Sequence, residues 1–149
     1  MEKLLIITPV KDSIQTTLDT IHAIMESGIS VPYTYTIYND NSTPENTAIL
    51  EKEAEKYGFR LVNISDLTDH PSPNYLLVLQ MAQEEALAQN AGLCIVESDV
   101  TVKPDTLQRL FDGAKARKDC GIAAAVTVDE SGAINYPYLY AKGHENQEY

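Results

Sequence analysis

Two carboxylates one residue apart, Glu97 and Asp99, close a short apolar run at residues 93–96. A run of this kind with β-branched residues is typical of a buried strand, and Pro104 suits the first turn of a following helix. The acids would then lie on the loop between a strand and a helix. Ligands bind at this edge of open α/β sheets, so the pair is a candidate binding site. Acidic residues also end many strands that bind nothing, and the spacing alone does not decide between these two interpretations.

Two other predicted strands end in polar loops of the same kind. Thr8-Pro9-Val10 follows a first apolar run, and Asn39-Asp40 follows a run of alternating Tyr and Thr residues. The polar residues that come next offer two caps for the following helix, one from Ser42 and one from Thr43. Capping therefore accounts for these later residues and leaves Asp40 open to another role.

The elements that would carry these loops alternate along the chain. Apolar and β-prone runs predict strands at 4–7, 33–38, 59–64, 93–96 and 121–128. The spacing of apolar residues predicts helices at 14–27, 44–57, 75–89 and 104–115. A turn at 129–132 followed by alternating tyrosines predicts a hairpin arm that carries Tyr136, Tyr138 and Tyr140.

This order of elements predicts the fold class. Short connections and right-handed crossovers place such strands in one mostly parallel sheet with helices on both faces, which is a Rossmann-like α/β fold. No linker or internal repeat divides the chain, so we expect residues 1–149 to form a single domain. The three polar loops after the first, second and fourth strands would then share one cleft.

The chain is strongly acidic, with 22 Asp and Glu residues against 11 Lys and Arg residues and a net charge of −11. This balance argues against a nucleic acid or an anionic membrane as the main partner. A phosphorylated ligand would need its charge neutralised locally. With so few basic residues, a divalent cation is the natural means.

The cellular compartment is predicted from the apolar segments and the cysteines. No stretch is apolar enough for a membrane span, and the first residues do not make a signal peptide. Cys94 and Cys120 each lie in an apolar run, which favours buried thiols in a reducing environment over a disulfide. We therefore expect a cytoplasmic protein.

The three loops together resemble those of family 2 glycosyltransferases of the GT-A fold. Thr8-Pro9-Val10-Lys11-Asp12 stands in the place of the family's T-P-x-Y-N, and Asn39-Asp40-Asn41-Ser42 in the place of its D-D-x-S. Glu97-Ser98-Asp99 corresponds to its D-x-D, and Pro104-Asp105-Thr106-Leu107 to the Pro-Asp that follows. The resemblance runs from Leu4 to about Val128.

The resemblance implies a nucleoside diphosphate sugar as the donor, with uridine as the expected nucleoside. Asp40 would accept a hydrogen bond from the base, and Asp99 would hold Mg²⁺ or Mn²⁺ between the phosphates. Asn74 lies where the family often directs a basic residue at the donor, after a loop at 65–73 that is long enough to fold over a site. The other residues expected to border the donor or its metal are Thr8, Pro9, Val10, Asn39, Glu97 and Ser98. The sugar would pass with inversion to a saccharide or lipid-linked acceptor.

In that family the second half of the protein supplies the acceptor site and the catalytic base. Because this chain ends at the predicted hairpin, we expect the donor-binding part of a transferase and assign no catalytic base. The rival interpretation is a non-catalytic module of the same fold that binds a nucleotide, a metal or a partner protein. A dinucleotide-binding fold is excluded, because no G-x-G-x-x-G follows a predicted strand.

Overall fold

Four parallel strands form the centre of the protein in the spatial order β3-β2-β1-β4. The structure is a computed structural model and describes residues 2–129 and 131–134. The strands are β1 (Leu4–Val10), β2 (Tyr33–Asn39), β3 (Arg60–Asn63) and β4 (Gly92–Ile95). A single 3₁₀ turn, η1 (Ile64–Asp66), follows β3.

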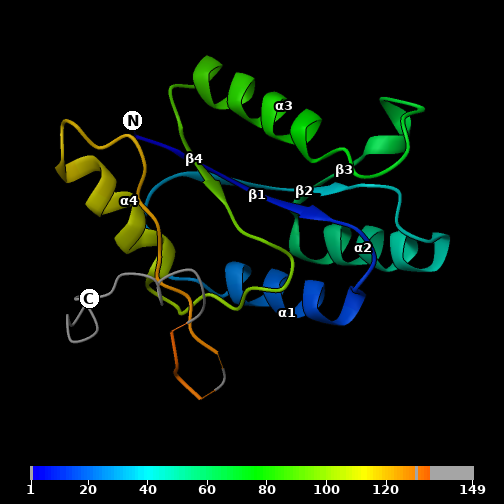
Figure 1. The fold of residues 1–149 in the computed structure, drawn as a ribbon, viewed down its shortest axis with the longest axis horizontal. Helices are drawn as coiled ribbons and strands as arrows, with labels where there is room; N and C mark the ends of the chain where they lie inside the picture. Colours follow the sequence, from blue (N-terminus) through cyan, green and yellow to red (C-terminus); the bar gives the residue numbers. More distant parts are fainter. Residues whose placement is uncertain (1, 130, 135–149) are drawn as a thin grey trace.

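Helices cover both faces of this sheet (Figure 1). One face is covered by α3 (Tyr75–Ala88), and Ile64 of η1 packs into the same buried cluster. The other face is covered by α1 (Ile14–Met25), α2 (Pro44–Tyr57) and α4 (Thr106–Ala116). The predicted α/β class, with a parallel sheet between two helical layers, is confirmed.

Alternate residues of β1 pack into the two layers, as the geometry of a strand requires. Leu4 and Ile6 belong to the buried cluster under α1, α2 and α4, whereas Leu5 and Ile7 pack against α3. All four side chains are buried. This explains why the first strand reads as a continuous apolar run rather than an alternating one.

The position of Pro9 in β1 explains where the sheet opens. Odd-numbered residues of β1 direct their backbone groups at β4, and the Val96 N–H donates to the Ile7 carbonyl at 2.9 Å. The next bond of this ladder would need an N–H at residue 9, which proline lacks. Pairing between β1 and β4 therefore stops at Ile7, while β1 stays paired with β2 to its end.

Local sequence signals place the ends of α2 correctly. Of the two expected caps, the one from Thr43 forms, because its Oγ1 accepts a hydrogen bond from the Asn46 N–H at 3.4 Å. The helix ends at Gly58, whose φ of 78° lies in the left-handed region that glycine adopts without strain.

The predicted start of α4 at Pro104 was wrong. The Pro104 carbonyl accepts a hydrogen bond from the Gly28 N–H at 2.9 Å, which binds this residue to the end of α1. The helix therefore begins at Thr106, after a turn in which the Thr106 N–H donates to the Lys103 carbonyl at 3.0 Å.

Residues 121–128 do not form the predicted fifth strand. They are irregular and exposed, Ile122 at 91 %, and in the described part of the chain this region makes a single isolated bridge, between Val128 and Ile134. Small apolar residues become a strand when a neighbouring strand takes up their hydrogen bonds, and the sheet formed by the described residues does not include this segment. The turn signal is confirmed, since the Asp129 N–H donates to the Ala133 carbonyl at 2.9 Å. The predicted tyrosine arm, Tyr136, Tyr138 and Tyr140, lies outside the described residues.

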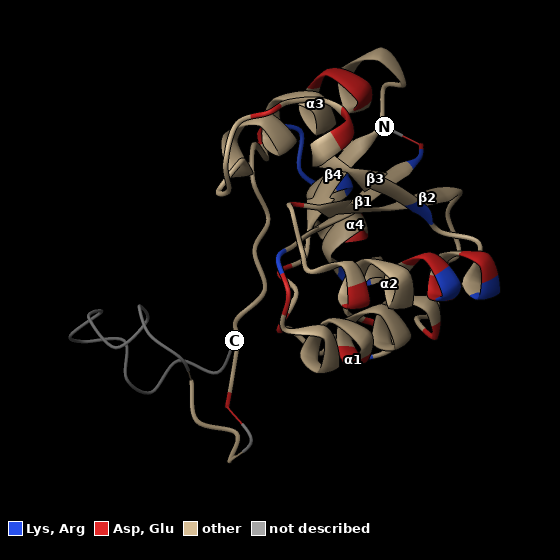
Figure 2. Ribbon diagram, turned by 90° about the vertical axis from the view of Figure 1, so that its right-hand side faces the viewer, with Lys and Arg blue, Asp and Glu red and all other residues tan. Residues whose placement is uncertain are grey.

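Both cysteines are free thiols, as predicted, and burial raises the pKa of Cys94 to about 11. Acidic residues lie on α1, α2 and α3, and Lys and Arg residues alternate with them on α2 (Figure 2). Across residues 2–129 and 131–134, no helix combines the length and the apolar character needed to cross a membrane.

Candidate functional site

The carboxyl ends of β2, β1 and β4 lie next to one another, because these strands are neighbours in the sheet. The three polar loops predicted to share a cleft therefore follow adjacent strands. The first two are joined directly, since the Asp40 N–H donates to the Val10 carbonyl at 2.7 Å.

Asp40 is the most strongly bound polar side chain at this edge and is only 8 % exposed. Its Oδ2 accepts hydrogen bonds from the Ser72 hydroxyl at 2.6 Å and the Asn74 N–H at 2.7 Å, and its Oδ1 accepts one from Asn74 Nδ2 at 2.8 Å. Burial alone would raise the pKa of Asp40, but these hydrogen bonds and the charge of Lys11 outweigh burial and lower it. The carboxylate is therefore held ionised in one orientation.

The acidic loop after β4 has a different character. Glu97 and Asp99 are exposed and Ser98 is half-buried. The Tyr75 hydroxyl donates a hydrogen bond to Glu97 Oε1 at 2.8 Å. Burial raises the pKa of Tyr75 to about 12, and this hydrogen bond acts in the same direction. Two carboxylates that face solvent leave oxygen atoms available to a ligand or a cation.

The two acidic positions are connected through consecutive residues. Asn74 binds Asp40 and Tyr75 binds Glu97, both at the start of α3. Asp40 and Glu97 are 57 positions apart in the chain, from 40 to 97, yet a dipeptide contacts both. The structure thus brings the predicted Asp40, Asn74 and Glu97 together at one edge.

Two predicted site residues direct their side chains into the protein instead. The buried Thr8 hydroxyl accepts a hydrogen bond from the Tyr35 hydroxyl at 3.0 Å. Asn39 Nδ2 donates to Thr47 Oγ1 at 3.0 Å and to Asn63 Oδ1 at 2.9 Å. These side chains hold the strand ends in place, so that at these positions only the backbone is left to border a ligand.

Asp12 locks the loop after β1 onto the start of α2. Its Oδ1 accepts hydrogen bonds from the Thr43 N–H at 2.8 Å and from Asn46 Nδ2 at 3.1 Å, and its own N–H donates to Ser42 Oγ at 2.8 Å. Asp12, Ser13 and Asn41 all have positive φ, a conformation that costs energy for residues other than glycine. Such strain persists where surrounding contacts fix it, and here it borders the candidate site.

Two depressions lie on the described surface. One, of about 340 Å³, adjoins the Asp40 cluster and is lined in part by His70, Pro73, Asn74 and Leu76. The other, of about 310 Å³, lies at the opposite end of the strands, around Tyr33 and Phe59. Neither of these two depressions is lined by Asp40 or Asp99.

Comparison with solved structures shows what this architecture is similar to. S. aureus TarS 1-349 in complex with UDP-GlcNAc matches with a TM-score of 0.55 and 16 % identity over 85 % of this chain and 38 % of that one. Mannosyltransferase PcManGT from Pyrobaculum calidifontis, in complex with GDP-Man and Mn²⁺, matches with a TM-score of 0.54 and 16 % identity over 72 % of this chain and 31 % of that one. No family model and no curated protein matches the sequence.

The chain has a glycosyltransferase-like fold. At 16 % identity these matches establish the fold and nothing finer. The chain spans less than half the length of the structures it matches.

Sequence reasoning did not find three residues that shape the edge of this glycosyltransferase-like fold: Asp12, Ser72 and Tyr75. The sequence places Asp12 in the segment that resembles T-P-x-Y-N, whereas the structure shows its side chain bound to Thr43 and Asn46 at the start of α2. Ser72 and Tyr75 flank the predicted Asn74, and the loop at 65–73 was expected to fold over a site. Its contact with Asp40 through Ser72 fits that expectation.

Proposed function

We propose that this chain binds a nucleoside diphosphate sugar, with uridine as the nucleoside, together with Mg²⁺ or Mn²⁺, as the donor site of an inverting glycosyltransferase of the family 2 type. The observation that carries the proposal is the juxtaposition of the buried Asp40 carboxylate and the exposed Glu97 carboxylate, each bound by one residue of a dipeptide. The buried carboxylate of Asp40 suits a hydrogen bond to a nucleobase, and the exposed carboxylate of Glu97 suits a cation and phosphates.

The remaining hydrogen-bonding capacity of Asp40 fits a nucleobase. An ionised carboxylate offers about four acceptor positions. Three are filled by Ser72 and Asn74, two of them on Oδ2 and one on Oδ1. The free position on Oδ1 matches a single N–H donor such as uracil N3–H, and the fixed carboxylate would select a base that presents a donor at that point.

The acidic loop fits a cation that the ligand itself helps to coordinate. The described residues contain no group of three or more His, Cys, Asp or Glu side chains placed to hold a metal. The protein would therefore supply Asp99, with Glu97 beside it, and the diphosphate and water would complete the coordination, which is common for Mg²⁺. A cation bound there would stabilise the negative charge that develops on the diphosphate leaving group.

The residues of this chain perform the binding part of the reaction. Asp40 would hold the nucleoside, Asp99 and Glu97 would hold the cation that neutralises the diphosphate, and the backbone at Thr8, Pro9 and Val10 would border the donor between them. An acceptor hydroxyl of a saccharide or a lipid-linked saccharide would attack the sugar carbon opposite the leaving diphosphate and give up its proton to a carboxylate base that is not assigned to a residue of this chain. The bond to the diphosphate would break as the new bond forms, which inverts that carbon.

Isothermal titration calorimetry of UDP with and without Mn²⁺ tests the proposal. We expect UDP to bind more tightly with Mn²⁺, and Asp99→Ala to remove that metal-dependent gain. Asp40→Asn keeps the shape of the side chain but changes its acceptors, and losing one hydrogen bond to a charged group lowers the UDP affinity about 10-fold or more. Asp119→Ala, which removes an exposed carboxylate from the segment after α4, is the matched control and leaves binding unchanged. UDP binding that survives both site substitutions contradicts the donor-site assignment.

A second candidate is a donor-binding module without turnover of its own, because no catalytic base is assigned among the residues of this edge. Incubation with UDP-GlcNAc or GDP-mannose and Mn²⁺ separates the two. Release of the nucleoside diphosphate supports a working transferase or hydrolase, whereas tight binding without release supports the module.

A further inference from the structure

Tyr75 is not one of the residues proposed to bind the donor, yet its side chain contacts the acidic loop. It is the first residue of α3, directly after Asn74, and its hydroxyl lies 2.8 Å from Glu97 Oε1. At 40 % exposure it is accessible from the same edge as Glu97. Its hydroxyl therefore stands between the helix and the acidic loop.

Val100 packs against the core, but the backbone of the acidic loop forms few hydrogen bonds to the sheet in the described structure. The ladder between β1 and β4 ends with the bond from the Val96 N–H to the Ile7 carbonyl, because Pro9 offers no further donor. After that point the backbone bond recorded for the loop is an internal one, from the Val100 N–H to the Glu97 carbonyl at 3.3 Å. The contact with Tyr75 thus ties Glu97 to a part of the protein that is itself fixed.

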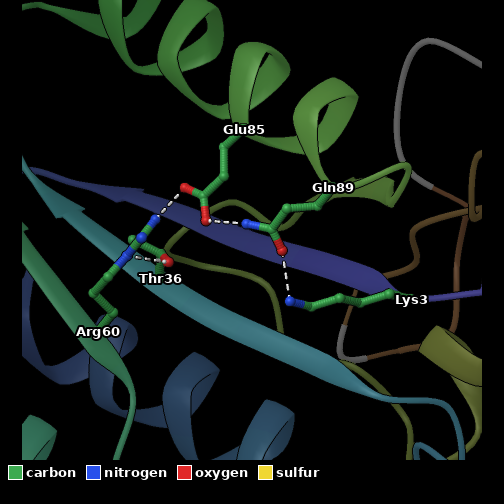
Figure 3. Close-up of polar contacts among 5 residues, drawn as sticks. All are labelled: Lys3, Thr36, Arg60, Glu85 and Gln89. Atoms are coloured by element: carbon green, nitrogen blue, oxygen red, sulfur yellow. Dashed lines mark hydrogen bonds and ion pairs between the residues drawn. The ribbon is translucent and has the colours of Figure 1, made fainter.

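The opposite end of α3 is anchored by a chain of polar contacts that crosses the sheet (Figure 3). Arg60 on β3 binds Thr36 Oγ1 at 3.0 Å and pairs with Glu85 on α3. Gln89 donates to Glu85 Oε1 at 2.9 Å and accepts from Lys3 Nζ. Near its carboxyl end the helix is therefore bound directly to Arg60 of β3, through Arg60 to Thr36 of β2, and through Gln89 to Lys3, the residue before β1. Just before its amino end it is bound to Asp40 through Asn74.

We infer that Tyr75 is a positioning residue: together with Asn74 it sets the separation between the Asp40 and Glu97 carboxylates, and so matches the edge to a ligand that carries both a nucleobase and a metal-bound diphosphate. The inference rests on the proposed function and extends it to a residue that acts through Glu97. By accepting the Tyr75 hydroxyl at Oε1, Glu97 keeps its second oxygen free for the cation or its water.

The test separates metal-dependent binding from metal-independent binding. Tyr75→Phe removes only the hydroxyl, and UDP affinity is measured by calorimetry with and without Mn²⁺. Losing one hydrogen bond that orients a charged ligand of the cation reduces the Mn²⁺-dependent gain about 5-fold, while UDP affinity without metal stays the same. Tyr33→Phe removes a hydroxyl at the opposite end of the strands and is the matched control.

A second variant shows whether Tyr75 acts through Glu97. Glu97→Ala also lowers the metal-dependent gain, and adding Tyr75→Phe to it produces no further loss, since the partner is already absent. Urea unfolding of each variant verifies that the fold is retained.

Each other outcome overturns the inference in a distinguishable way. If Tyr75→Phe weakens UDP equally with and without Mn²⁺, or if its effect is the same in the Glu97→Ala background, Tyr75 supports the fold and does not position Glu97. If Tyr75→Phe has no effect while the wild type shows metal-dependent binding, this inference fails and the proposed function stands. A wild-type protein that binds no UDP under either condition refutes both.

Discussion

Replacing Asp40 with alanine should destabilise the protein far more than the loss of an ordinary surface carboxylate. The substitution leaves three donors without their acceptor, one on Ser72 and two on Asn74. Asn74 is buried, with 7 % exposure, whereas Ser72 is half-buried and can bind water instead. Hydrogen bonds to charged groups contribute about 1.5–3 kcal/mol each and do not add fully, so we expect a loss of about 3 kcal/mol.

Urea unfolding monitored by circular dichroism measures this loss. With a typical dependence on urea of about 2 kcal/mol per molar, a loss of about 3 kcal/mol moves the midpoint down by roughly 1.5 M. Asp119→Ala, at an exposed position paired loosely with Arg117 at 3.9 Å, should shift the free energy of unfolding by less than about 0.5 kcal/mol.

A double-mutant cycle identifies the partner. Asn74→Ala alone removes one of the three bonds to Asp40, and the Asp40→Ala/Asn74→Ala pair should cost clearly less than the sum of the two single changes. An Asp40→Ala protein as stable as Asp119→Ala, or a pair whose effects simply add, would refute the view that this hydrogen-bonded cluster fixes the edge of the sheet.

Three further predictions concern the acid dependence of stability, the end of α2 and the reactivity of Cys94. Because the pKa of Asp40 is lowered in the folded protein, its ionised form stabilises the fold above the ordinary aspartate pKa of 3.8, and this contribution disappears as the pH falls through the lower folded value. Acid unfolding followed by circular dichroism should therefore depend less steeply on pH below about 4 in Asp40→Asn than in the wild type. Gly58→Ala forces a side chain into φ of 78° and should lower the free energy of unfolding by about 1 kcal/mol, with Gly113→Ala, inside α4, stabilising if anything. In a thiol titration at pH 8, Cys94 should stay unmodified until urea is added, because burial raises its pKa to about 11; rapid modification that disappears in Cys94→Ser would contradict this.

The sequence predicts the sheet and its order of elements because those depend on local patterns. A continuous apolar run marks β1, and the β-prone Tyr and Thr residues mark β2. Thr43 and Gly58 mark the ends of α2. The segment at 121–128 escapes prediction for the opposite reason. Its residues favour a strand only when a partner is present, and a pattern within one segment cannot reveal whether the partner exists.

The acidic residues of the candidate site can be predicted from the sequence, but the residues that form hydrogen bonds to them cannot. Asp40 and Glu97 follow strands, so their common edge can be deduced from the topology. The groups that hold them, Ser72 and Tyr75, lie in a loop and at a helix start more than 20 positions away from either acid, and no spacing rule connects them. Asp12 shows the same limit, because it precedes α1 in the chain but its side chain forms hydrogen bonds at the start of α2.

The ring of Pro9 has a consequence for ligand affinity. With a donor at that position, β1 and β4 could add a further rung, and any molecule entering between the strand ends would first have to break it. Because Pro9 has no N–H, the ends of β1 and β4 stay unpaired before anything binds. A ligand that binds there therefore does not have to break a hydrogen bond between the strands, and its binding free energy is not reduced by that cost. Pro9→Ala should accordingly lengthen the shared ladder, a change that amide hydrogen exchange at residue 9 can detect.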